Sequence, residues 1–212
     1  GIAAFELGRS TEAREAFDTV MALAEAEGDR DMLARACLNL GAVANLEGDP
    51  ATALTLYHLA LPLFQRLGQI RGQSQTHQSL ALSYRDLARH DDADDAYREA
   101  IRLGLELGYP PIVSMATIGR AELLVLRDDP QAALGLVEWG LRLARRLEDP
   151  ITEGTGLRVR AGARAALGRE AEAGDDLQLA LRISRETGNR LLEAETLRDL
   201  GKVALRLDDT VA

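Results

Sequence analysis

Small and large apolar residues recur along this chain every 40 residues, and the columns stay in register over five copies. A period of this length is typical of arrays in which each repeat packs on its neighbours. The clearest columns are the turn glycines Gly28, Gly68, Gly108 and Gly188; the small residues Ala13, Ala53, Ala93, Ala133 and Ala173; and the large residues Phe17, Tyr57, Tyr97, Val137 and Leu177. The chain is therefore expected to be a stack of similar units.

Each copy has the apolar spacing of two helices joined by a turn. In MLARACLNLGAVANLEGDP, Leu33, Cys37, Leu40 and Ala44 fall on one stripe of a helix. The turn residues LEGDP follow, and an Asp-Pro pair suits the start of a second helix. That second helix ends where Gly68 can adopt the left-handed conformation of a helix C-terminus. The pattern predicts an all-α chain of about eleven helices arranged as helix hairpins.

The register of the repeats predicts a single repeat domain over residues 1–212. Its parts are a partial repeat at 1–28, full repeats at 29–68, 69–108, 109–148 and 149–188, and a last helix at 189–212. Gly1 falls in the middle of a first helix, so the chain is expected to be a piece of a longer array. Ile2, Ala3 and Phe5 would then form an uncapped end that favours self-association.

One second helix contains a proline. The stretch YHLALPLFQRLG aligns with the second helices of the other copies, which predicts a helix rather than a strand. Pro62 has no backbone N–H, so it leaves the carbonyl of His58 without its helical donor. A local bend between His58 and Pro62 is expected.

These columns resemble the tetratricopeptide repeat (TPR). The residues that carry the resemblance are Leu40-Gly41, Ala53, Tyr57 and Ala60 in one copy and Leu80-Ala81, Tyr84, Ala93, Tyr97 and Ala100 in the next. The usual repeat has 34 residues, and here about six more lengthen the helices and their connection. Later copies depart from the pattern, with Arg120 and Arg160 in the leucine slot and Arg164 in the aromatic slot. The resemblance implies a right-handed superhelix of TPR-like helix hairpins.

The 40-residue period and sequence segments such as ALRISRETGN and GLRLARRLED also resemble those of the helical arrays in large bacterial transcriptional regulators. These include LuxR-type and MalT-like activators and the SARP-type activators of antibiotic clusters. The resemblance implies a region that senses an inducer or a partner, without identifying either. Any DNA binding would then reside in another part of the parent protein.

Composition narrows the classes of partner. The chain carries 34 acidic and 25 basic residues, a net charge of -9, which disfavours nucleic acid and anionic membranes as direct partners. The single cysteine, Cys37, excludes an internal disulfide framework and fits a reducing compartment. Nearly all basic residues are arginine, as in proteins of GC-rich bacteria. A cytoplasmic bacterial protein is expected.

No arrangement of residues indicates catalysis. His58, His77 and His90 lie in different copies, and no motif spacing links them to Cys37. Cys37 and His77 share a slot on the core stripe, where packing explains them. The acidic run HDDADDAYRE opens a second helix, where carboxylates favour the positive end of the helix dipole. We therefore expect no enzyme, no cofactor and no metal site.

The TPR resemblance places ligand binding on the first helices, which line the concave side of the superhelix. A projection of these helices gives the candidate binding residues, from an apolar and amide-rich part to a more charged part. They are Arg35, Leu38, Asn39, Asn45, Gln75, Gln78, Leu82, Arg85, Met115, Ile118, Glu122, Arg158 and Arg198. The cationic clamp by which the family binds a peptide C-terminus is absent, because its slots hold residues such as Leu38, Ala42 and Met115.

The sequence therefore favours a non-catalytic protein- or peptide-binding domain, as in the sensor region of a transcriptional regulator. Two alternatives remain open, a domain that binds a small-molecule inducer and a general scaffold unrelated to transcription. A further alternative is that these residues complete the inner wall of the array without binding a ligand, since exposed apolar residues are common on any protein.

Overall fold

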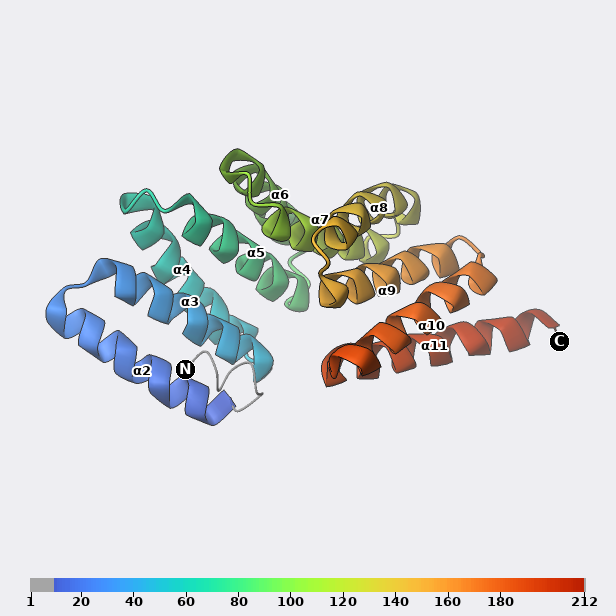
Figure 1. Cartoon of the computed structure of the whole chain (residues 1–212), viewed down its shortest axis with the longest axis horizontal. Helices are drawn as coiled ribbons and strands as arrows, with labels where there is room; N and C mark the ends of the chain where they lie inside the picture. The colour runs from blue at the N-terminus through green and yellow to red at the C-terminus, as the bar shows by residue number, and fades with distance from the viewer. Residues whose placement is uncertain (1–9, 212) are drawn as a thin grey trace. The chain divides into compact units, whose positions relative to one another are not determined.

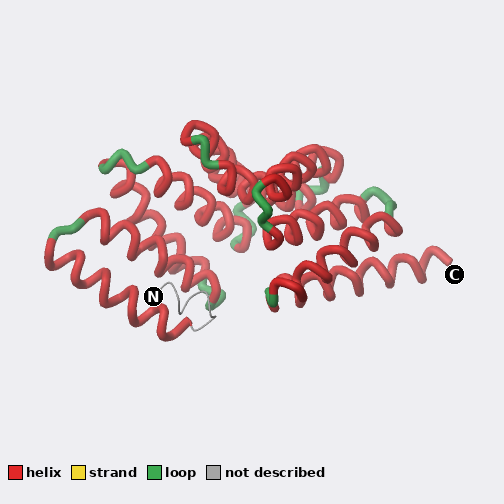
Figure 2. The backbone as a smooth tube through the Cα atoms, in the orientation of Figure 1, coloured by secondary structure: helices red, strands yellow, loops and turns green. Residues whose placement is uncertain are grey.

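The computed structural model describes residues 10–211, and the side chains of residues 10–206. This part of the chain forms ten helices and no strands (Figure 1, Figure 2). The helices are α2 (Ser10–Glu27), α3 (Arg30–Leu46), α4 (Pro50–Arg66), α5 (Ile70–Asp86), α6 (His90–Leu107), α7 (Pro110–Leu126), α8 (Pro130–Arg146), α9 (Pro150–Ala166), α10 (Glu170–Thr187) and α11 (Arg190–Val211). The all-α prediction is confirmed. The further helix expected around Gly1 lies outside the described residues, as do Ile2, Ala3 and Phe5.

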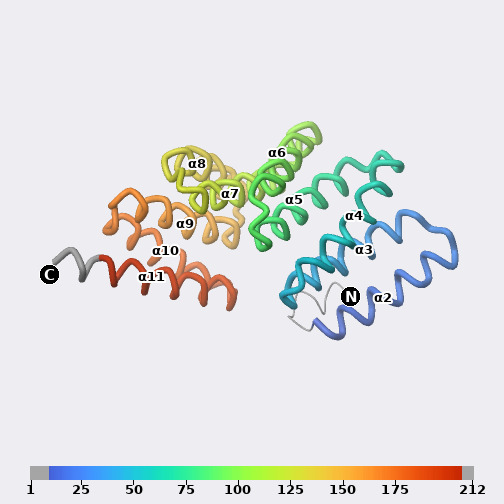
Figure 3. The backbone as a smooth tube through the Cα atoms, turned by 180° about the vertical axis from the view of Figure 1, so that it is seen from behind, coloured from blue at the N-terminus to red at the C-terminus, as the bar shows by residue number. Residues whose placement is uncertain are grey.

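The chain divides into two compact units, Gly1–Gly108 and Tyr109–Ala212. Within each unit, successive helices lie side by side in the order of the sequence (Figure 3). The first helices of the repeats are α3, α5, α7, α9 and α11, and the second helices are α2, α4, α6, α8 and α10. The first helices α3, α5, α7 and α9 each pack against the second helix that follows, as in α3 with α4, so the hairpins predicted from the 40-residue period are present.

The turns between helices share one conformation. A residue with positive φ follows each helix from α2 to α10, at intervals of 20 residues. Glycine holds six of these positions, while Ala88, Asp128 and Glu148 adopt the same left-handed conformation at φ values of 55°, 60° and 53°. Glu148 therefore adopts the same left-handed conformation as the glycines at the equivalent positions, although a residue with a side chain disfavours that conformation.

Several helices begin with an aspartate cap. The side chains of Asp29, Asp49, Asp129 and Asp149 each accept a hydrogen bond from a backbone N–H three residues later. This bond satisfies one of the free donors at a helix start. The acidic run expected to open a helix does so in α6, where Asp91 and Asp92 lie in the first turn.

Small residues allow the helices to approach closely. A methyl group at Gly41 would collide with the buried ring of Tyr57, and one at Gly140 would collide with Ile118. Serines bind the facing helix, because Ser74 and Ser114 donate to the carbonyls of Ala100 and Gly140 at 2.9 and 2.8 Å. At these hairpin contacts, a small residue on one helix therefore packs against a large residue on the other helix.

The fourth full repeat replaces part of its apolar packing with ion pairs. Arg160 and Arg164, which depart from the family pattern, both bind the buried carboxylate of Asp176 on α10. Arg160 makes a two-pronged contact at 2.9 and 2.6 Å, and Arg164 adds a contact of 2.6 Å. Glu138 of α8 binds the remaining side of Arg160 at 2.7 Å. These ion pairs explain how two arginines fit apolar slots.

Pro62 does not end its helix. Helix α4 continues through it to Arg66, and the proline ring lies on the exposed side of the helix. The bend expected between His58 and Pro62 stays a prediction.

Candidate ligand-binding surface

Two pockets in the described part of the chain lie on the face formed by the first helices. One pocket belongs to the N-terminal unit, between α3 and α5, and another belongs to the C-terminal unit, between α7, α9 and α11. Most of their lining side chains project from first helices. This is the face to which the TPR resemblance assigns ligand binding.

The pocket of the N-terminal unit has a volume of about 390 Å³. Its lining residues are Arg35, Leu38, Asn39, Phe64, Gln69, Arg71, Gly72 and Gln75. Gln69 donates to Asp31 at 2.6 Å, and Arg35 pairs with the same carboxylate at 3.0 Å. The pKa of Asp31 lies below its usual value, because these two hydrogen bonds outweigh the effect of burial. The pocket combines an apolar base with amide and charged groups at its rim.

Four of the sequence-predicted residues line this pocket, namely Arg35, Leu38, Asn39 and Gln75. Asn45 has a different environment, because its amide donates to the Tyr57 hydroxyl at 3.0 Å and its oxygen accepts from Ser83 at 2.9 Å. It joins α3, α4 and α5. The remaining predicted residues of this unit, Gln78, Leu82 and Arg85, are partly exposed on α5 outside the pocket.

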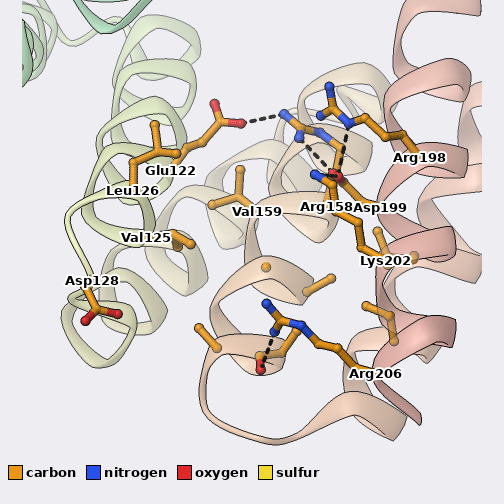
Figure 4. Close-up of a pocket in the computed structure, with 16 residues that line it drawn as sticks. Glu122, Val125, Leu126, Asp128, Arg158, Val159, Arg198, Asp199, Lys202 and Arg206 are labelled. Atoms are coloured by element: carbon orange, nitrogen blue, oxygen red, sulfur yellow. Dashed lines mark hydrogen bonds and ion pairs between the residues drawn. The ribbon is translucent and has the colours of Figure 1, made fainter. Parts of the chain in front are cut away.

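The pocket of the C-terminal unit has a volume of about 420 Å³ and is shown in Figure 4. Apolar side chains and small residues of α7, α9 and α11 form one part of its wall, including Val125, Val159, Gly162 and Val203. Charged side chains line the rest. They are Glu122, Asp128, Arg158, Arg198, Asp199, Lys202 and Arg206.

Arg158 is the centre of an ion-pair cluster at this pocket. Its side chain is only 10% exposed and contacts Glu122 at 2.7 Å, Asp199 at 3.1 Å and Glu195 at 3.5 Å. Figure 4 shows Glu122 reaching it from α7 and Asp199 from α11. Burial by itself would lower the pKa of Arg158, but the attraction of Glu122 and Glu195 outweighs it and raises the pKa. The guanidinium therefore stays charged and joins three first helices.

The pKa of Asp199 is held below its usual value. Burial would raise it, but hydrogen bonds from Lys202 at 3.0 Å and from Arg158 have the larger combined effect. Arg198 also approaches the same carboxylate, at 3.3 Å. At the far end of the pocket, Arg206 donates to the carbonyl of Ala165 at 3.1 Å (Figure 4).

Three predicted residues of the C-terminal unit, Glu122, Arg158 and Arg198, meet at this pocket. Met115 is exposed on α7 but does not line it. Ile118 requires a correction, because it is buried in the core against Gly140 and Gly156 and offers no surface to a ligand. The helical projection of the sequence had assigned Ile118 to the exposed face of α7.

The candidate binding residues omit several pocket residues. Asp199 and Arg206 on α11 are absent, as are Phe64 and Gln69 of the N-terminal unit. A sequence signal exists for Arg206, because Arg198, Lys202 and Arg206 follow one another at a helical spacing of four residues. Phe64 gave no such signal, since it belongs to a second helix and reaches the pocket through the gap that Gly72 leaves.

The histidines and the cysteine are not assembled into a common site. His58 contacts the Tyr84 hydroxyl at 3.0 Å, while His77 is half-buried beside Glu99 and Arg102. Cys37 is buried, and burial raises the pKa of its thiol. Among residues with described side chains, no group of three potential metal ligands occurs. None of the described helices is long and apolar enough to span a membrane.

Helix hairpins of alternating first and second helices, with small residues at each contact, define a helical repeat protein. The tetratricopeptide repeat model matches residues 1–66 and 33–106, which together make up half of the chain. The chain therefore belongs to the tetratricopeptide repeat family. A search of curated proteins found no match.

Solved structures with low sequence identity share the fold. The Rap conjugation gene regulator of plasmid pLS20, in complex with the Phr* peptide, has a TM-score of 0.77 at 13% identity over 98% of this chain. BtubC from P. vanneervenii has a TM-score of 0.73 at 19% identity, covering 94% of this chain and 85% of that one. A STAND protein with a tetratricopeptide repeat sensor from Pyrococcus horikoshii has a TM-score of 0.67 at 16% identity over 96% of this chain.

This chain spans 60% of the Rap regulator and 33% of the STAND protein. At these identities the likeness shows the fold alone.

Proposed function

We propose that this chain is a non-catalytic, protein- or peptide-binding TPR domain. The observation that carries the proposal is the position of the two pockets, because both units have a hollow of about 400 Å³ on the face of their first helices. Exposed or half-exposed apolar residues such as Leu38 and Leu126 lie beside amide and charged groups there. This mixture suits an extended peptide, which needs apolar contacts and hydrogen bonds to its backbone.

Selection of peptides from a random display library against the whole chain tests this proposal. We expect Leu38→Glu and Leu126→Glu to weaken binding of the selected peptides at least tenfold, because these side chains line the pockets of the N-terminal and C-terminal units. Leu59→Glu and Leu105→Glu are matched controls, since these leucines are exposed on second helices. A library that yields no binder contradicts the proposal, and so do peptides that bind all four variants equally.

We further propose that the domain is the sensor or interaction region of a cytoplasmic bacterial transcriptional regulator. The relatives in structure include a conjugation gene regulator with a bound peptide and a STAND protein whose TPR part is a sensor. The resemblance of segments such as ALRISRETGN and GLRLARRLED to those of regulator arrays supports the same assignment. The reading frame of the full gene tests it, because a regulator must also encode an NTPase or DNA-binding module. A gene that encodes repeats alone contradicts it.

A small-molecule inducer is the second candidate ligand. The pocket of the C-terminal unit, at about 420 Å³, falls within the size range of small-molecule sites. A thermal-shift screen with metabolites tests this alternative. A hit must lose its stabilising effect when Gly162 is replaced by Leu, which fills this pocket, and keep it when exposed Gly135 is replaced.

A further inference from the structure

We infer that the C-terminal pocket is a subsite for an acidic peptide segment, which places an apolar side chain over Gly162 and a neighbouring Asp or Glu carboxylate on Arg198 and Lys202. This inference rests on the proposed peptide-binding function. It adds the chemistry of the ligand and the residues that select it.

The apolar half of the subsite is built by three valines from three parts of the wall. Val125 projects from α7, Val159 from α9 and Val203 from α11, and all three line the same pocket (Figure 4). Leu126, more than half exposed, extends this apolar surface at the rim. Val159 and Val203 are only 3% and 6% exposed, so the apolar surface that an aliphatic side chain of a ligand removes from water here belongs mainly to Val125 and Leu126.

Gly162 is the residue that opens the pocket. A Cβ atom built on it meets only a methyl group of Val125, at 3.8 Å, which is an ordinary van der Waals distance. Packing therefore does not require glycine at this point of α9, in contrast to Gly154 and Gly156 on the same helix, where a Cβ would collide with neighbours. The equivalent slots of other repeats hold Ala42, Leu82, Glu122 and Lys202, and the three longer side chains among these would occupy this space.

The cations of α11 supply the polar half. Arg198 and Lys202 have side chains 58% and 63% exposed, and both share the single carboxylate of Asp199. Asp199 already binds Arg158, whose charge is also matched by Glu122 and Glu195. The two exposed cations therefore retain N–H donors that no residue of the cluster accepts from. A carboxylate of a ligand can take these donors in charge-assisted hydrogen bonds.

Charge complementarity selects the occupant. A chain with a net charge of -9 repels acidic ligands over most of its surface, whereas four basic side chains line this pocket beside three acidic ones, Glu122, Asp128 and Asp199. The apolar wall and the cations lie at one pocket of side-chain dimensions. An apolar side chain and an acidic side chain two residues apart lie on the same face of an extended peptide and match both features, whereas a basic peptide meets Arg198 and Lys202 as like charges.

NMR titration of the whole chain with defined peptides tests the inference. The probe is the capped pentapeptide acetyl-Gly-Leu-Gly-Glu-Gly-amide, in which the Leu and Glu side chains share one face of the extended chain, and the readout is the methyl signals of Val125, Val159 and Val203. We expect saturable shifts at these three valines. The Gln analogue of the peptide and the double variant R198Q/K202Q should each bind at least fivefold more weakly.

Gly162→Leu should abolish the shifts, because the new side chain fills the pocket. Gly135→Leu is the matched control, since Gly135 lies exposed on α8 with no atom within 4 Å of an added Cβ, and it should leave binding unchanged. Equal binding of the Glu and Gln peptides overturns the inference, as does binding that survives Gly162→Leu. Binding that requires a free peptide C-terminus instead of the Glu side chain also overturns it.

The two proposals fail in different ways. If peptides selected from the library bind the first-helix face but the acidic probe leaves the three valines unmoved, the subsite is wrong and the binding function stands. If the library yields no peptide and the probe causes no shift, both are wrong.

Discussion

Single side chains decide how closely the helices of this chain approach one another. Gly41 admits the ring of Tyr57, and Gly72 admits the ring of Phe64, because neither glycine carries a Cβ. The sequence shows glycines and aromatic residues in fixed columns, which predicts that small residues face large ones. It does not show that Gly72 contacts Phe64, since this contact joins one repeat to the next rather than two helices of one repeat.

Pro62 is a residue whose replacement should stabilise the protein. It lies inside α4 on the exposed side, so Pro62→Ala restores a backbone N–H without removing buried surface. The free energy of unfolding should rise by about 1–3 kcal/mol, as measured by urea denaturation. Leu59→Ala, an exposed change in the same helix, should alter it by less than about 0.5 kcal/mol. A Pro62→Ala variant no more stable than the parent would contradict the prediction.

His77 should make stability depend on pH. Burial lowers its pKa, Glu99 opposes this effect and Arg102 adds to it. Because the unfolded chain takes up the proton near pH 6.5 while the folded chain resists it, the stabilisation is present above pH 6.5 and is lost as the pH falls through the lowered pKa.

The measurement is urea unfolding at pH 7.5 and pH 5.5. His77→Leu should reduce the loss of stability between the two pH values, and leucine is present at this slot in later repeats, at Leu157 and Leu197. His58→Gln, at an exposed position, should retain the loss. If His77→Leu shows the same pH dependence as the parent chain, another group is responsible.

At the scale of elements, buried charge takes over part of the role of apolar packing. Asp176 of α10 holds Arg160 and Arg164 of α9, and Glu138 of α8 completes the cluster. The arginines were visible in the sequence as departures from the repeat pattern. Their partner was not, because Asp176 occupies a slot where other repeats have Leu56, Ala96 or Leu136, and only the packing of α10 on α9 brings the charges together.

Removal of the central carboxylate should destabilise the C-terminal unit. Asp176→Ala leaves two largely buried arginines without their common partner, and loss of one partner of a buried ion pair costs about 3–5 kcal/mol. Replacing all three residues by leucine should recover most of this loss, because apolar residues hold these slots in other repeats. Circular dichroism during urea unfolding measures both. The prediction is wrong if Asp176→Ala is as stable as the parent.

At the scale of the whole molecule, α11 exposes leucines at positions whose equivalents in the preceding repeat are buried. Leu197 is 46% exposed, although Leu157, one repeat earlier, is fully buried. Leu205 is 68% exposed, whereas Ala165 at the equivalent slot is buried. In the preceding repeat these slots face the second helix α10. The exposed leucines of α11 therefore form an apolar strip that favours association with another helix.

We predict that the chain self-associates through this strip of α11. Leu205→Arg should reduce association, because it places a charge in the apolar contact. Sedimentation velocity over a range of protein concentrations measures the effect. Leu105→Arg, which changes a similarly exposed leucine on α6, should leave association unchanged. A parent chain that remains monomeric at all concentrations contradicts the prediction.

The sequence by itself determined the secondary structure and the pairing of helices. The 40-residue columns predicted the helix hairpins, the left-handed conformation of Gly68 and Gly188 at the ends of their helices, and the acidic start of α6. These features could be predicted because they depend on local spacing, which every copy of the repeat displays again. The assignment of ligand binding to the first-helix face came instead from the resemblance to the tetratricopeptide repeat.

Only the tertiary structure decided which side chains meet at the pockets. Arg158 binds Glu122 and Asp199, which lie 36 and 41 residues away on neighbouring first helices. Ile118 lies in the core rather than at the surface. The physical reason is that helical spacing fixes the direction of a side chain to one face, while its burial and its partners depend on how closely neighbouring helices approach. Gly162 shows this most clearly, because its open space becomes visible only when α7 and α11 stand on either side of α9.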